Sequence, residues 1–137
     1  MRKPLTFALT ATLLITGCAT TTAPSLPLNT TYQVEWIGDR PLIDRSHVTI
    51  TFADDSRAHG HAGCNRWFAT YQSTSDQLSF SQAGATRMMC VPALMEQEQR
   101  FLQALGQVER WEQGNNSELR LWYSQDETLR LFAEQPE

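Results

Sequence analysis

The feature that most constrains the fold of this chain is an alternation of apolar and polar residues with a period of two. It begins at Thr31 in the run TYQVEWI and recurs in residues 47–52, which are rich in β-branched residues. A strand places successive side chains on opposite faces, so this period predicts strands with one buried face. Residues 53–56 (ADDS) are typical of a hairpin turn, and residues 57–63 are predicted to form the returning strand.

More short strands are predicted further along the chain. Within residues 67–71, Trp67, Ala69 and Tyr71 share one face and Phe68 lies on the other. The final strands carry large apolar residues on both faces, which indicates a sheet covered on one side that wraps or meets a helix on the other. The strand-like segments are residues 67–71, 78–80, 83–89, 108–112, 118–123 and 128–133.

The period changes in residues 92–106 (PALMEQEQRFLQALG), which are predicted to form a helix. Pro92 suits a first helical turn, and Gly106 can end the helix. Glu96 and Glu98 are expected on the solvated face, where general acid–base chemistry is not favoured. The apolar face is formed by Leu94, Met95, Phe101, Leu102 and Leu105.

Together these segments predict a mainly β (α+β) fold. We expect a small antiparallel β-barrel-like domain with one α-helix inserted before the final β-meander. Closure of the sheet removes exposed strand edges and accommodates strands that are apolar on both faces.

The first residues predict export. Arg2 and Lys3 precede an uncharged apolar run, residues 5–15, and the following Ile15-Thr-Gly-Cys18 resembles the bacterial lipobox. The run is too short to span a bilayer core of about 30 Å, which favours a secretory signal. We therefore predict a lipoprotein signal peptide in residues 1–17, a lipidated N-terminus and flexible tether in residues 18–29, and one domain in residues 30–134.

Acylation of Cys18, with palmitate or similar chains, would place the protein in the cell envelope. Two or three acyl chains make a stable anchor, whereas one chain is marginal. Ala19 follows the cysteine, and by analogy a residue other than aspartate there goes with sorting to the outer membrane in bacteria with two membranes. We expect an outer-membrane protein that faces the periplasm.

Once Cys18 is acylated, two cysteines remain, Cys64 and Cys90. An even number outside the cytoplasm favours a disulfide, which would stabilise the fold by roughly 3–4 kcal/mol in the chain-entropy model. A nucleophilic Cys64 is an alternative that needs a neighbouring base. His61 is three positions away, an odd spacing that puts it on the opposite face of a strand unless a bulge intervenes.

A metal site is a further alternative. His59 and His61 form a His-x-His pair that aims two imidazoles the same way, with Cys64 as the third ligand and His47 as an optional fourth. Structural zinc normally has four ligands with recognisable spacing, so solvent-facing histidines are the simpler interpretation. We predict no metal and no cofactor.

Charge excludes one class of partner. The formal net charge is −4, and no basic cluster is present. Nucleic-acid binding requires a basic face, so we expect no nucleic-acid partner. The acidic pair Asp54-Asp55 falls in a predicted turn, which favours a protein without enzymatic activity.

Two motifs carry a family resemblance. The first is Gly60-His-Ala-Gly-Cys-Asn65, followed by Tyr71, and the second is Ala85-Thr-Arg-Met-Met-Cys90. With the helix and the terminal Leu-x-Leu strands, they make residues 31–132 similar to the META domain (DUF306), also called the HslJ-like family. Ala69 departs from the pattern, because the family often has a glycine there. The matching motif residues are Gly60, Gly63, Cys64 and Asn65, then Thr86, Met88 and Cys90.

The resemblance implies a compact β-rich fold with one helix and a small envelope lipoprotein. It also implies an association with heat shock and, in one branch, with novobiocin resistance. It implies no established catalytic residue. The motif residues are expected to be structural: Gly60 and Gly63 permit a bulge or a close backbone approach, and Asn65 tolerates unusual dihedral angles or bonds its own backbone.

We therefore expect a non-catalytic, monomeric envelope lipoprotein that acts in stress tolerance or envelope maintenance and contacts an envelope protein. The alternative is a periplasmic module that binds a small ligand or inhibitor at a barrel mouth lined by tryptophans. The same tryptophans could instead be packing residues of the core and the barrel girdle. They are Trp36, Trp67, Trp111 and Trp122.

Overall fold

The computed structural model describes residues 24–134. The predicted signal peptide and Cys18 lie outside the described residues. The described elements, in chain order, are β1 (Thr31–Ile37), β2 (Arg40–Pro41), β3 (Thr49–Phe52), β4 (Arg57–His61), β5 (Arg66–Thr74), β6 (Gln77–Phe80), β7 (Gly84–Ala85), α1 (Pro92–Leu105), β8 (Val108–Gln113), β9 (Glu118–Tyr123) and β10 (Glu127–Ala133).

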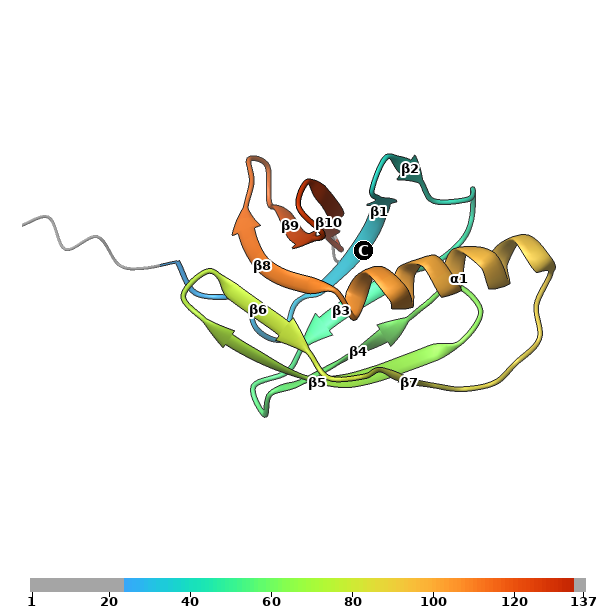
Figure 1. Ribbon diagram of the computed structural model, residues 1–137, viewed down its shortest axis with the longest axis horizontal. Helices are drawn as coiled ribbons and strands as arrows, with labels where there is room; N and C mark the ends of the chain where they lie inside the picture. The colour runs from blue at the N-terminus through green and yellow to red at the C-terminus, as the bar shows by residue number, and fades with distance from the viewer. Residues whose placement is uncertain (1–23, 135–137) are drawn as a thin grey trace, which may run out of the picture.

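Eight of these strands form a closed antiparallel barrel, in the order β1-β3-β4-β5-β6-β8-β9-β10. The ring closes where β10 pairs with β1, from Tyr32 opposite Ala133 to Ile37 opposite Leu129. The short strands β2 and β7 lie outside this ring and pair antiparallel with β1 and β5, respectively. Figure 1 shows β8, β9 and β10 on one side, β3 to β7 on the other, and α1 running across the front. The predicted mainly β fold, with one helix before a final meander, is confirmed.

The barrel interior is filled by the apolar side of each strand. In β5, Trp67, Ala69 and Tyr71 are buried while Phe68 and Thr70 are exposed, as the alternation predicted. The ring of Trp67 packs edge-on against Phe101 of α1, with the ring centroids 5.7 Å apart. Its indole N–H donates to the Thr49 carbonyl oxygen at 3.0 Å. Removing a large aromatic side chain from water stabilises a fold by a few kcal/mol. Since the indole N–H stays paired, no cost of an unsatisfied polar atom reduces this gain.

The helix α1 starts at Pro92 and ends before Gly106, close to the predicted limits. Phe101 and Leu105 face the core as expected, while Leu94, Met95 and Leu102 are only half-buried. The buried face also contains Gln97 and Glu98, so the predicted solvent exposure of Glu98 is wrong. Within residues 24–134, no helix is long and apolar enough to cross a membrane.

The predicted strand over residues 83–89 is wrong for most of its length. Only Gly84 and Ala85 pair with β5, opposite Phe68 and Trp67. Beyond them, side chains replace strand partners: the N–H of Met88 donates to Asn65 Oδ1 at 2.6 Å. The segment 86–90 is therefore a loop held by an asparagine rather than a sheet edge.

The ordered part of the domain starts before Thr30. Leu26 is 9% exposed and belongs to the hydrophobic core, and the N–H of Asn29 donates to the Phe52 carbonyl oxygen at 2.7 Å. Two residues of the segment that the sequence assigns to a tether, Leu26 and Asn29, therefore contact the barrel, while Leu28 between them is 45% exposed.

Candidate functional site

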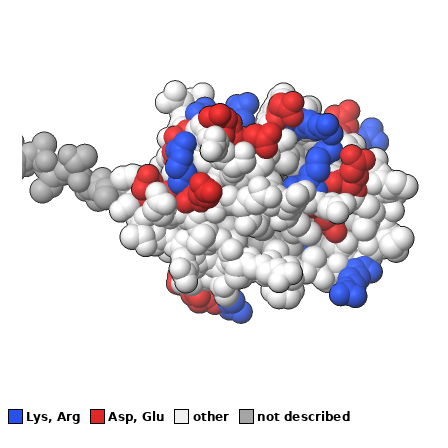
Figure 2. All heavy atoms as spheres, viewed as in Figure 1, with Lys and Arg blue, Asp and Glu red and all other residues white. Residues whose placement is uncertain are grey.

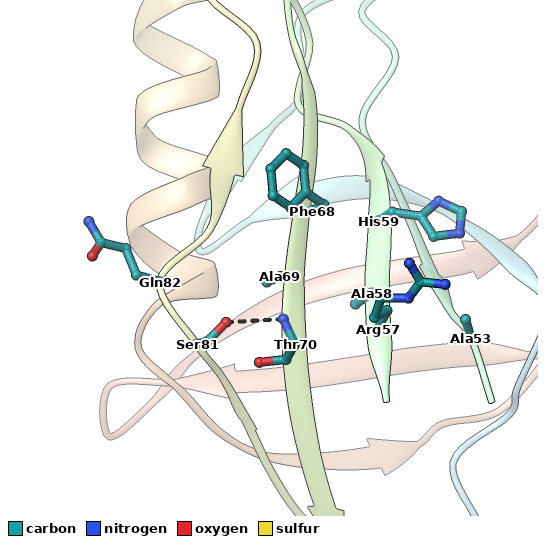
Figure 3. Close-up of a pocket in the computed structure, with 9 residues that line it drawn as sticks. All are labelled: Ala53, Arg57, Ala58, His59, Phe68, Ala69, Thr70, Ser81 and Gln82. Carbon is teal, nitrogen blue, oxygen red and sulfur yellow. Dashed lines mark hydrogen bonds between the residues drawn. The ribbon is translucent and has the colours of Figure 1, made fainter. Parts of the chain in front are cut away.

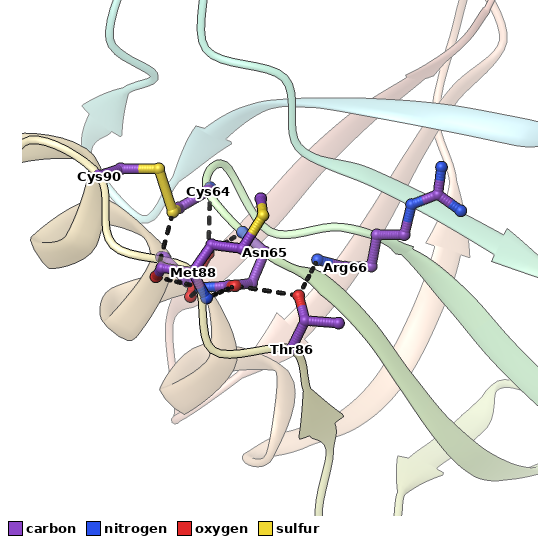
Figure 4. The surroundings of a disulfide bond; sticks show 7 residues. Cys64, Asn65, Arg66, Thr86, Met88 and Cys90 are labelled. Carbon is purple, nitrogen blue, oxygen red and sulfur yellow. Dashed lines mark hydrogen bonds between the residues drawn. A yellow bond between two sulfur atoms is a disulfide. The ribbon is translucent and has the colours of Figure 1, made fainter.

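The two sequence motifs meet at one corner of the barrel, where Cys64 and Cys90 form a disulfide. Their Cα atoms are 6.0 Å apart, and they are 26 positions apart in the chain. The predicted disulfide is confirmed. In this state neither sulfur is a thiolate, so Cys64 cannot act as a nucleophile or metal ligand. Figure 4 shows the bond beside the loop that carries Met88.

Asn65 ties this loop to the barrel. Its side chain is 2% exposed, and its amide oxygen accepts hydrogen bonds from the Met88 N–H at 2.6 Å and the Thr86 hydroxyl at 2.9 Å. Its Nδ2 donates to Glu98 Oε1 at 2.7 Å. Asn65 has a negative φ, so an unusual dihedral angle does not explain its place in the motif. Its side chain instead bonds Glu98 and the loop that carries Thr86 and Met88.

Glu98 is the central acceptor of the corner. Its Oε2 accepts the backbone N–H groups of Cys64 at 3.0 Å and of Asn65 at 2.6 Å. Because the carboxylate is buried, these bonds replace the water it would otherwise bind. The sequence contains the signal that we missed: Glu98 lies four residues after Leu94 and three before Phe101, on the apolar face of α1.

Gln97 performs a similar task for a second loop. Its Oε1 accepts the N–H of Ile43 at 2.8 Å, and its Nε2 donates to the Ser46 hydroxyl at 2.9 Å. Adjacent polar residues of α1 thus fix the loop after β2 and the loop between β4 and β5. Neither role was predicted, because a polar residue on an otherwise apolar stripe shows no partner in the sequence.

The two motif glycines, Gly60 and Gly63, stand where the backbone has no room for a side chain or adopts a positive φ. A Cβ on Gly60 would lie 2.0 Å from the Thr49 carbonyl oxygen of the neighbouring strand, so only glycine fits. Gly63 has a φ of +116°, a conformation open to glycine and costly for other residues. Gly60 therefore lets β4 approach β3 closely, and Gly63 lets the chain turn from β4 toward β5 directly before Cys64.

The remaining motif residues act through the backbone and a hydroxyl. Thr86 Oγ1 accepts the N–H of Arg66 at 3.1 Å while donating to Asn65. Met88 contributes its backbone, and its side chain is 58% exposed. The corner is therefore a rigid structural junction of three segments, and its polar atoms are used in holding it together.

Two further carboxylates, Asp55 and Glu118, are held by arginine partners. Asp55 pairs with Arg57 in the β3–β4 turn, and the hydrogen bond from Arg57 lowers the pKa of Asp55. On the outer face, hydrogen bonds from Arg120 and then Arg130 lower the pKa of Glu118. These carboxylates stay ionised near neutral pH, which does not suit a general acid.

The four tryptophans do not line one cavity. Trp67 and Trp111 are buried in the core, and the indole N–H of Trp111 donates to the Ser75 carbonyl oxygen. Trp36 and Trp122 lie half-buried on the outside of the barrel, with guanidinium groups of Arg130 and Arg110 over their rings at 5.8 and 4.1 Å. The alternative of a barrel mouth lined by the four tryptophans is therefore wrong, and the packing interpretation accounts for these residues.

A groove of about 510 Å³ lies on the outer surface of β4 and β5. Phe68, 64% exposed, and His59 form one end of it, and Arg57 and Thr70 lie at the next cross-strand position. Figure 3 shows Ser81 closing the far side, with its hydroxyl accepting the Thr70 N–H at 3.0 Å. We call this the Phe68 groove.

Charges on the surface are mixed in sign. Figure 2 shows acidic and basic side chains interleaved along one edge, while most of the face below them is uncharged. The ion pairs on β8 to β10 join Glu112, Glu118, Arg120 and Arg130. This view therefore shows no extended surface of a single sign.

The closed barrel and the disulfide corner formed by the two motifs are the features to compare with known proteins. The family model described as the META domain matches residues 25–136. The chain belongs to the META domain family. The resemblance inferred from the two motifs is confirmed, and the match to the META domain begins one residue before the buried Leu26.

Solved structures support the same fold. The META domain of this chain is similar to an NMR structure of a protein from Burkholderia xenovorans, with 20% identity and a TM-score of 0.67, covering 90% of this chain and 100% of that one. A second NMR structure has 23% identity and a TM-score of 0.60, covering 75% of this chain and 87% of that one. Among curated proteins, none matches significantly.

Proposed function

We propose that this META-domain protein is a non-catalytic lipoprotein of the bacterial envelope. Acylated Cys18 would anchor it in the outer membrane facing the periplasm, where it would support stress tolerance or envelope maintenance by contacting an envelope protein. The observation that carries the proposal is the Cys64–Cys90 disulfide in the motif corner. Such bonds form and persist outside the reducing cytoplasm, in agreement with the signal and lipobox at residues 1–18.

The anchor is tested by labelling cells with a palmitate analogue and separating their membranes. We expect label and protein together in the outer-membrane fraction, and no label on Cys18→Ser. The matched control is Cys64→Ala with Cys90→Ala, which leaves Cys18 in place and keeps the label. Equal labelling of Cys18→Ser would reject the anchor.

The stress role is tested in a deletion strain that carries the wild type, Cys18→Ser or no gene. After heat shock or novobiocin treatment, we expect full survival only with the wild type. Survival restored equally by a fully secreted Cys18→Ser form would show that the anchor is dispensable. Survival unaffected by the deletion would reject the stress role.

The Phe68 groove favours a second candidate function, the binding of a small ligand. Its volume of about 510 Å³ falls within the usual range for ligand sites. An exposed aromatic ring beside a hydroxyl, an imidazole and a guanidinium would suit an amphipathic molecule. Titration with a panel of antibiotics and hydrophobic compounds should shift the amide signals of Thr70 and Ser81, which line the same groove, and Phe68→Ala should abolish these shifts. Shifts absent for the whole panel would count against this function.

A further inference from the structure

All three histidines of the protein line one groove on the outside of β3 and β4. The groove has a volume of about 490 Å³ and also contains Arg66 and the side chains of three threonines. His47 comes just before β3, and His59 and His61 point outward from β4. We call this surface the histidine groove. Three imidazoles from two segments concentrate nitrogen donors at one place on the surface.

The distances match those of ligands that share one ion. The rings of His47 and His61 have their centroids 5.5 Å apart, and two imidazoles on one tetrahedral ion are about 5 Å apart by this measure. His47 Nε2 lies 3.7 Å from Glu134 Oε1, compared with about 3.3 Å for two ligands of a tetrahedral ion. His47 thus lies within a few tenths of an ångström of coordination spacing from both His61 and Glu134.

The backbone of each of these residues is already fixed by the barrel. The N–H of His61 donates to Thr49 Oγ1 at 3.0 Å, and the N–H of Glu134 donates to the Thr31 carbonyl oxygen at 2.9 Å. Val48, next to His47, forms a bridge with Ala62. In residues 24–134 no group of three such side chains is placed to hold a metal ion, so the side chains of the histidine groove must move to complete a site.

We infer that the histidine groove binds one transition-metal ion through His47 and His61, with Glu134 as the carboxylate ligand. Imidazole nitrogen and carboxylate oxygen suit Cu²⁺, Ni²⁺ and Zn²⁺, and the general order of stability makes Cu²⁺ the tightest. His59 lies two residues from His61 on the same strand face, about 6.6 Å along it. The imidazole ring that packs beside His61 is that of His47, so we assign His59 as a neighbour of the site.

Arg66 opposes the cation. It pairs with His61 across β4 and β5 and lines the groove, so its positive charge lowers the affinity of the site for metal. Replacing it with a neutral residue of similar length should strengthen binding, a result that a nonspecific surface site elsewhere would not give.

The test is a titration of the purified full chain, carrying no histidine tag, with Cu²⁺ and separately with Zn²⁺ at neutral pH. Calorimetry should give one ion per chain, and the electron spin resonance spectrum of bound Cu²⁺ should show coupling to two imidazole nitrogens. His47→Ala and His61→Ala should each weaken binding at least about tenfold, and Glu134→Gln should weaken it less. Arg66→Gln should tighten it.

The matched control is His59→Ala, which removes an imidazole from the same groove and should change the affinity less than about threefold. The replaced side chains lie outside the hydrophobic core, so each variant should keep the fold. Amide proton spectra check this. The assignment is overturned if His59→Ala weakens binding as much as His61→Ala. It is also overturned if the His47 and His61 variants bind as the wild type does, or if micromolar metal fails to saturate the protein.

Discussion

The amide nitrogen of Asn65 lies 2.7 Å from one carboxylate oxygen of Glu98, and the backbone nitrogen of Asn65 lies 2.6 Å from the other. One residue of the β4–β5 loop is thus bound twice by one residue of α1. Both are buried, and Asn65 in turn holds the loop that leads to Cys90. The helix and the disulfide corner form one structural unit.

Glu98→Ala should destabilise the domain by about 3 kcal/mol, because three buried donors would lose their acceptor. Urea unfolding at neutral pH measures the change. The control is Glu96→Ala, on the same helix but with a side chain that is 70% exposed, where we expect a change within about 0.5 kcal/mol. Equal effects of the two substitutions would contradict the role given to Glu98.

Replacing Cys64 and Cys90 together with alanine should lower the free energy of unfolding by roughly 3–4 kcal/mol, because the unfolded chain regains the entropy of an open loop. Reducing the wild type should lower its midpoint of urea unfolding to that of the double variant. Reductant should leave the double variant unchanged. A wild type insensitive to reductant would argue that the bond adds nothing to stability.

Gly60→Ala should prevent the native packing of β4 against β3, because the added Cβ would lie 2.0 Å from a backbone oxygen of Thr49. We expect a loss of more than about 3 kcal/mol or no folded protein. Gly106→Ala is the matched control: Gly106 has an ordinary helical φ of −67°, and alanine there should raise stability by about 0.4–1 kcal/mol. Circular dichroism during thermal unfolding distinguishes the two.

Stability should fall at alkaline pH through Tyr123. Burial, followed by the charge of Glu127, raises the pKa of this tyrosine from 10.0 to about 12. A raised pKa means that the folded state holds the proton more tightly, so this contribution is complete below pH 10 and is lost as the pH approaches about 12. It amounts to about 2–3 kcal/mol.

Tyr123→Phe should therefore show a smaller loss of stability between neutral pH and about pH 11, measured by urea unfolding. Absorbance of the ionised phenol supplies an independent titration of the wild type. An identical pH profile for the variant and the wild type would show that Tyr123 ionises as readily in the fold as outside it.

Features set by local periodicity were predictable from the sequence, and those set by tertiary partners were not. The alternation in β5 predicted which of its side chains are buried, because a strand has only two faces. The disulfide was predicted from the even number of cysteines left once Cys18 is assigned to a lipid anchor, in a chain predicted to be exported. The position of Glu98 on the apolar face of α1 indicates that it is buried. The N–H groups that Gln97 and Glu98 accept lie more than 30 positions away in the sequence, and no local pattern identifies these partners.

The same limit explains the wrong strand prediction beyond Ala85 and the unpredicted burial of Leu26. Residues 83–89 have strand-like composition, but pairing with β5 ends at Thr86, and the N–H of Met88 donates to the Asn65 side chain instead of a neighbouring strand. The tether resembles a linker in composition, yet Leu26 finds a place in the core. In both cases the deciding contact comes from a segment distant in the sequence.

The described chain enters the barrel at Leu26 and Asn29 and continues directly into β1, which is paired with β10 on one side and with β3 and β2 on the other. A mechanical pull on the N-terminus would load these cross-strand bonds together, in shear, instead of opening them one at a time as a zipper. The domain should therefore yield to force in a single step, at a higher load than a strand peeled from a sheet edge would bear.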